Sequence, residues 1–136
     1  MLLLTQPMRK ILVADDEHHI VESLINLLSK HYEVEYVRNG KKAMENINNG
    51  GLDGIVLDWD MPHIPGLSYH NSEDQKFYGN EIAKMARKLY PNIPIILRSS
   101  ASSEFTDELK PFNVFCLDKS VDKEIILKYF KENIKE

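Results

Sequence analysis

Two short stretches decide the fold: Ile11-Leu12-Val13-Ala14-Asp15-Asp16-Glu17 and Ile55-Val56-Leu57-Asp58-Trp59-Asp60. In each of them a continuous apolar run, short enough for a buried strand, ends in carboxylates. Three further strand-like runs follow at residues 34–37, 95–97 and 114–117. The segments between and after these runs have apolar residues at helical spacing, at 20–28, 41–49, 81–90, 103–109 and 121–134.

This alternation of five strands with five helices predicts an α/β fold. Strands joined through helices form right-handed crossovers and pair in parallel, and near-continuous apolar strands are typical of a sheet covered on both faces. We therefore expect a doubly wound, five-stranded parallel sheet with helices on both faces. The helix at 103–109 is expected to be short and weak. The helix at 81–90 is expected to turn four apolar residues inward: Ile82, Met85, Ala86 and Leu89.

Composition predicts one soluble domain over residues 1–136, with 1–8 as an N-terminal extension. Of the 136 residues, 43% are hydrophobic and 28% are charged, which is ordinary for a globular protein. The net charge of −4 argues against direct nucleic-acid binding or an anionic membrane surface. No apolar run approaches the roughly 20 residues that span a bilayer. The single cysteine, Cys116, excludes an internal disulfide and fits a cytoplasmic location.

One connection is much longer than its neighbours. Between Asp58 and Glu81 lie 22 residues, whereas a strand-to-helix connection normally takes about 2–6. We interpret residues 67–80 as an insertion after the third strand. Its aromatic residues Tyr69, Phe77 and Tyr78 are either a surface for a partner or part of an ordinary loop, and the sequence does not decide between the two.

Polar side chains follow four of the five strands, where the working residues of a doubly wound sheet gather. Asp15 and Asp16 follow the first strand, Asp58 the third, Ser99 the fourth and Lys119 the fifth. Carboxylates in one crevice repel each other unless a cation joins them, and oxygen ligands without His or Cys favour Mg²⁺. A lysine and a hydroxyl beside them would hold a phosphoryl group, and a carboxylate can itself be the nucleophile.

The arrangement resembles the receiver domain of two-component response regulators, over residues 9–134. The matching segments are 11–17, 55–62 with Gly66, 94–100 and 117–119. The resemblance implies a flavodoxin-like sheet with strand order 2-1-3-4-5. It also implies that Asp58 is the phosphoacceptor, that Asp15 and Asp16 hold Mg²⁺ with the backbone carbonyl of Asp60, that Ser99 contacts the phosphoryl group, and that Lys119 pairs with it.

The same resemblance implies the partners. A histidine kinase or phosphotransfer protein would donate the phosphoryl group, and a downstream protein target would bind through the fourth and fifth helices and the fifth strand. A phosphorylation-dependent homodimer is compatible with it. Neither nucleic acid nor a membrane is an expected partner. The chain is not expected to be an enzyme beyond catalysing its own phosphorylation and dephosphorylation.

Three positions depart from the family pattern. Ser120 follows Lys119 where the family commonly has proline, and Cys116 replaces the usual aromatic residue three places before the lysine. Phe115 is adjacent, but strand alternation points it to the other face. Arg98 stands where the fourth strand is normally apolar, and a buried guanidinium requires an acidic partner.

Several alternatives remain open at the level of sequence. Asp15 and Asp16 could do no more than cap the first helix, Ser99 could be an ordinary loop hydroxyl, and Lys119 could be a solvated lysine. Asp58-Trp59-Asp60 also resembles the Asp-x-Asp signature of haloacid-dehalogenase-type phosphatases, but in that family this strand comes first and the acidic pair last. A receiver-like binding module that is never phosphorylated is the other rival.

Overall fold

The structure is a computed structural model that describes residues 8–59, 78–99 and 106–134. Strands and helices alternate along these residues as the sequence predicts. In chain order the elements are β1 (Lys10–Ala14), α1 (His18–Ser29), β2 (Glu33–Val37), α2 (Gly40–Asn49), β3 (Gly54–Asp58), α3 (Tyr78–Leu89), β4 (Ile95–Ser99), α4 (Thr106–Leu109), the 3₁₀ turn η3 (Lys110–Phe112), β5 (Phe115–Asp118) and α5 (Lys123–Asn133).

The five strands form one parallel sheet in the order β2-β1-β3-β4-β5, which confirms the predicted architecture and strand order. Because every strand runs in the same direction, all five carboxyl ends lie along one edge of the sheet. The register places Asp58 of β3 opposite Arg98 of β4, and Ser99 of β4 opposite Asp118 of β5. The polar residues at the strand ends are therefore neighbours in space.

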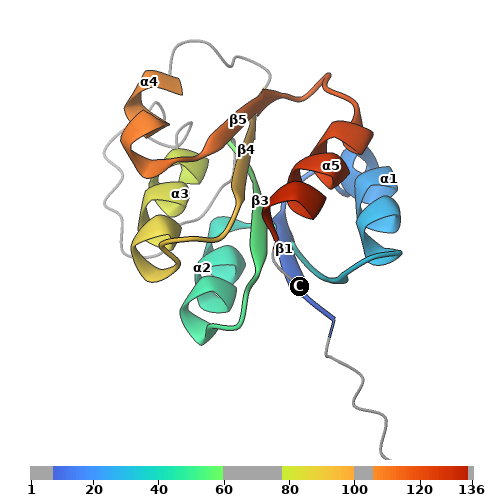
Figure 1. Cartoon of the computed structure of the whole chain (residues 1–136), viewed down its shortest axis with the longest axis horizontal. Helices are drawn as coiled ribbons and strands as arrows, with labels where there is room; N and C mark the ends of the chain where they lie inside the picture. Colours follow the sequence, from blue (N-terminus) through green and yellow to red (C-terminus); the bar gives the residue numbers. More distant parts are fainter. Residues whose placement is uncertain (1–7, 60–77, 100–105, 135–136) are drawn as a thin grey trace, which may run out of the picture.

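Helices cover both faces of the sheet. In Figure 1, α1 and α5 lie on one side, and α2, α3 and α4 lie on the other. Alternate strand residues supply the two cores: Ile11 and Val13 pack with α1 and α5, whereas Leu12 and Ala14 pack with α2 and α3. Among the described residues, no helix is both long and apolar enough to cross a bilayer.

Local signals fix the ends of the helices. The side chain of Asn39 accepts a hydrogen bond from Lys42 N at 2.8 Å and begins α2, and Gly50, with φ of 81°, follows its last residue. Four residues of α4 are described before Pro111 turns the chain into η3. Residues 103–105, the start of the helix expected at 103–109, lie outside the described part of the chain, so its expected length stays a prediction.

The expected inward face of α3 is wrong at two positions. Ile82 and Ala86 are buried as predicted, but Met85 and Leu89 are 42% and 55% exposed. The buried face instead includes Ala83, which is fully buried. A small residue lets the helix backbone approach the sheet closely, so the helix is rotated toward its alanines and away from its longer side chains. Helical spacing alone did not predict that choice.

The long connection returns to the sheet at Tyr78, where α3 begins. The last three residues of the expected insertion at 67–80 are therefore helical, whereas Tyr69 and Phe77 lie outside the described residues. Gly79 N donates a hydrogen bond to Trp59 O at 3.1 Å. A Cβ atom on Gly79 would lie 2.2 Å from Asp58 O, so only glycine lets α3 approach the end of β3 this closely.

Candidate functional site

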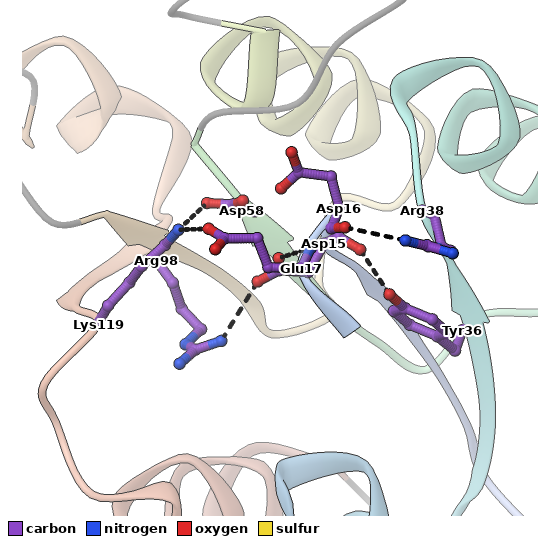
Figure 2. Close-up of polar contacts among 8 residues, drawn as sticks. All are labelled: Asp15, Asp16, Glu17, Tyr36, Arg38, Asp58, Arg98 and Lys119. Carbon is purple, nitrogen blue, oxygen red and sulfur yellow. Dashed lines mark hydrogen bonds and ion pairs between the residues drawn. The ribbon is translucent and has the colours of Figure 1, made fainter. Parts of the chain in front are cut away.

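Carboxylates from β1 and β3 meet at the carboxyl edge of the sheet. Asp15 and Asp58 are almost fully buried there, at 2% and 1% exposure. Glu17 N donates to Asp15 Oδ1 at 2.8 Å, which fixes the turn after β1, and the Tyr36 hydroxyl donates to Asp15 O at 2.8 Å. The half-buried Asp16 completes the group, and Figure 2 shows these side chains around one centre. The structure thus brings together the predicted carboxylates of β1 and β3.

Lys119 provides the positive charge opposite Asp58. Its backbone N donates to Ser99 O at 3.0 Å, which holds the loop after β5 against β4. Its Nζ lies 2.9 Å from Asp58 Oδ1 and 3.9 Å from Glu17 Oε1 (Figure 2). Burial by itself would lower the pKa of Lys119, but the hydrogen bond and charge of Asp58, with Asp15 and Glu17, raise it above its ordinary value. The ammonium group therefore stays protonated, and Lys119 is not a solvated surface lysine.

Arg98 has the acidic partner that its buried position requires. The residue is 6% exposed, and its Nη1 lies 3.6 Å from Asp15 Oδ2. Burial raises the pKa of Asp15, although the Glu17 backbone N–H and the charges of Lys119 and Arg98 act to lower it. Arg98 and Lys119 therefore place two cations among the carboxylates at this edge.

Of the two remaining predicted site residues, Ser99 lies within the described part of the chain and Asp60 does not. Ser99 ends β4 and is buried beside Lys119, to which its carbonyl is hydrogen-bonded. It is therefore a residue of the site and not a hydroxyl of a distant loop. Asp60, whose backbone carbonyl is the remaining expected metal ligand, lies outside the described residues.

The departures around β5 are visible in the packing. Cys116 packs on the α2–α3 core and Phe115 on the α1–α5 core, as strand alternation predicts. Burial raises the pKa of the Cys116 thiol, so it behaves as a small apolar group. Within the described part of the chain every peptide bond is trans, including the one before Ser120.

Three residues at this edge were not predicted as site residues. Glu17 contacts Lys119, Tyr36 binds the carbonyl of Asp15, and Arg38 Nη2 lies 3.5 Å from Asp16 O. Tyr36 and Arg38 come from the end of β2, which is the neighbour of β1 in the sheet. The predicted strand order would have pointed to them, because it places the ends of β1 and β2 together.

The carboxylates fit a hard divalent cation. One oxygen each from Asp15, Asp16 and Glu17 lie within 4.8 Å of one another, and Asp58 faces the same edge (Figure 2). Such a donor set, with oxygen alone and a buried member, suits Mg²⁺. Among the described residues, Asp15, Asp16 and Glu17 are therefore the ones whose oxygens lie close enough together to share one cation.

Comparison with known proteins identifies the family. The chain belongs to the response regulator receiver family, because the profile of the response regulator receiver domain matches residues 11–131. It is 33% identical over 125 residues, or 88% of the chain, to a 3',5'-cyclic-nucleotide phosphodiesterase regA of Dictyostelium discoideum, and 32% identical over 95 residues, or 69% of the chain, to the response regulator MprA of Mycobacterium sp. strain KMS.

The chain spans only 14% and 36% of the lengths of these two relatives. Among solved structures, it is similar to a CheY-like response regulator receiver domain protein from Methanospirillum hungatei JF-1. The TM-score is 0.75 at 22% identity, over 93% of this chain and 94% of that one, which supports the fold.

Proposed function

We propose that this protein accepts a phosphoryl group on Asp58 from a histidine kinase or phosphotransfer protein, with Mg²⁺, and thereby switches its binding to a protein target. The observation that carries the proposal is the contact of 2.9 Å between Lys119 Nζ and the buried carboxylate of Asp58, beside the acidic residues of β1. A structural ion pair alone would not require three carboxylates at the same edge.

The proposed step is an in-line transfer. A carboxylate oxygen of Asp58 attacks the phosphorus of a phosphohistidine. The new P–O bond forms as the P–N bond breaks, and the bonding electron pair leaves on the imidazole nitrogen. The product is an aspartyl phosphate. Mg²⁺, held by Asp15, Asp16, Asp58 and the Asp60 carbonyl, would offset the charge of the phosphoryl oxygens.

Lys119 and Ser99 stabilise the product in this proposal. Lys119 already contacts Asp58, so a small movement of its ammonium would pair it with a phosphoryl oxygen. The hydroxyl of Ser99, at the end of β4, would donate a hydrogen bond to the same group. Because the backbone N of Lys119 donates a hydrogen bond to Ser99 O, a shift of either residue would move the ends of β4 and β5 together.

The proposed output is a change in binding at α4, β5 and α5. We infer no enzymatic activity toward other substrates: the chain would only speed its own phosphorylation and dephosphorylation. The ion pair between Lys84 and Glu108 joins α3 to α4, and it would be among the contacts that change when α4 moves. We place this activity in the cytoplasm, where the kinases that phosphorylate such receivers act.

Mass spectrometry tests the proposal. After incubation with Mg²⁺ and acetyl phosphate, the wild type should gain one phosphoryl group, and Asp58→Asn should gain none. Asp53→Asn is the matched control, because Asp53 directly precedes β3, at the end of the strand opposite Asp58, and is part-exposed. It should be labelled like the wild type.

Other outcomes would contradict the proposal. Persistent labelling of a folded Asp58→Asn would mean that another residue accepts the group. Release of phosphate with multiple turnovers would favour a phosphatase. An unlabelled wild type, whether with a small donor or with kinases, would favour a binding module that does not depend on phosphorylation.

A further inference from the structure

Arg98 is a charged residue that follows three apolar residues in β4 and precedes Ser99. The rest of β4 up to this point is Ile95, Ile96 and Leu97, all of them buried. Strand pairing fixes its backbone on both sides, since it lies opposite Asp58 in β3 and Leu117 in β5, and Trp59 N donates to Arg98 O at 2.8 Å. The backbone of Arg98 is therefore held in place, which leaves the guanidinium little freedom to move out of the site.

The guanidinium faces Asp15 without binding it tightly. Nη1 lies 3.6 Å from Asp15 Oδ2, and within the described part of the chain neither atom has a hydrogen-bond partner. Both side chains are more than nine-tenths buried. Asp15 Oδ1 is already bonded to Glu17 N, so Oδ2 is the oxygen left to face a cation. The ion pair neutralises charge at this oxygen but leaves its lone pairs available.

We propose that Arg98 is a resident counter-ion of Asp15 that competes with Mg²⁺: it stabilises the metal-free site and weakens metal binding. The inference deepens the proposed function and rests on it for the identity of the metal. A guanidinium stays charged under all ordinary conditions, so this competition is permanent.

Charges at this edge give the direction of the effect. The carboxylates of Asp15, Asp16, Glu17 and Asp58 are faced by the cations of Lys119 and Arg98, with Arg38 at the rim. A divalent ion entering this group meets two buried positive charges instead of one. A unit charge several ångströms from an ion at the effective dielectric of a protein changes the affinity by about tenfold or more.

Titration with Mg²⁺ measures the effect directly. Trp59 is the only tryptophan and follows Asp58, so its fluorescence is the readout. The variants are Arg98→Met, which keeps the length of the side chain without charge, and Arg98→Lys, which keeps the charge. At pH 8 the dissociation constant for Mg²⁺ should fall about tenfold in Arg98→Met and stay within about threefold of the wild type in Arg98→Lys.

Thermal melting without divalent ions is the second measurement. Arg98→Met should melt about 5 °C or more below the wild type, because the buried Asp15 loses the cation that faces its Oδ2, and Mg²⁺ should recover most of the loss. Adding Asp15→Asn to Arg98→Met removes the stranded charge and should restore the metal-free melting temperature in part.

Equal dissociation constants in the wild type and Arg98→Met would overturn the inference. So would a double variant that is no more stable than Arg98→Met, because the loss would then come from packing alone. Failure of the proposed function is distinguishable: Asp58 would stay unlabelled by phosphodonors while the Mg²⁺ affinities still differed between the variants.

Discussion

Two arginine side chains at opposite edges of the sheet show two uses of the same group. Arg98, at the carboxyl edge, faces the carboxylate of Asp15 at 3.6 Å. Arg87, from α3, lies at the amino edge and donates hydrogen bonds of 2.7–2.9 Å to carbonyls that precede β4 and β5. These are the carbonyls of Tyr90, Ile93, Phe112 and Asn113.

Arg87 and Arg98 differ in the kind of group that their guanidinium groups contact. The guanidinium of Arg87 is bonded to main-chain oxygens, which no ligand displaces, and it joins the chain before β4 to the chain before β5. Burial lowers the pKa of Arg87, yet an arginine remains charged. Arg98 instead faces an ionisable side chain, that of Asp15, at the edge where the candidate metal site lies. Main-chain acceptors hold the arginine at the amino edge, whereas a charged side chain faces the arginine at the carboxyl edge.

Replacing Arg87 gives the largest expected effect on stability. Arg87→Met should lower the free energy of unfolding by about 3 kcal/mol, because part-buried carbonyls lose a charged donor. Arg87→Lys should recover only part of this, since an ammonium group does not span four acceptors. Urea unfolding measures both. Phosphorylation by acetyl phosphate in the folded fraction should be unchanged, and a selective loss of phosphorylation would break the contrast between the two edges.

A smaller effect is expected from pH at the carboxyl edge. Burial raises the pKa of Asp15 in the folded protein, so the folded state takes up a proton that the unfolded chain still lacks. This contribution to stability is fully present below the unfolded pKa of 3.8 and is lost as pH rises through the folded pKa.

Without metal, the melting temperature of the wild type relative to Asp15→Asn should therefore rise as pH falls from 7.5 toward 4. Thermal melting in EDTA across this range measures it. A difference that is flat with pH would show that Asp15 is not desolvated in the folded protein.

The smallest effect is expected from an exposed ion pair at the amino edge. Lys10 Nζ lies 3.9 Å from Glu33 Oε2, and the side chain of Glu33 is 62% exposed. Glu33→Gln should change the free energy of unfolding by less than about 0.5 kcal/mol, and added salt should reduce the change further. Urea unfolding at low and high salt provides the measurement. A loss near that of Arg87→Met would show that this edge depends on surface charge.

Strand patterns carried most of what the sequence predicts about this molecule. Continuous apolar runs gave four of the strands and the shorter Val34–Val37 pattern gave β2, whereas the family resemblance gave the strand order; together they place Asp15, Asp58 and Lys119 at one edge. The need of a buried guanidinium for an acid was also predictable from Arg98. The identity of the acid that Arg98 contacts was not predictable, because it depends on the register between neighbouring strands.

The errors and omissions have physical causes of their own. Helical spacing placed Met85 and Leu89 inward, but close packing favoured the face that carries alanines. Arg87 gave no signal, because its partners are backbone carbonyls that every residue possesses. Tyr36 and Arg38 were missed because they lie far along the chain from Asp58 and become relevant only once β2 is placed beside β1.

The close contact between Gly79 and the end of β3 has a consequence for protein engineering. Trp59 and Gly79 are joined by a backbone hydrogen bond, so the chain leaves the sheet and returns to it at adjacent points. Lengthening a connection whose ends are already fixed costs only about 0.6 kcal/mol for each doubling of its length. The adjacent ends therefore predict that an insert with neighbouring termini, such as a fluorescent protein, would be tolerated between Trp59 and Gly79.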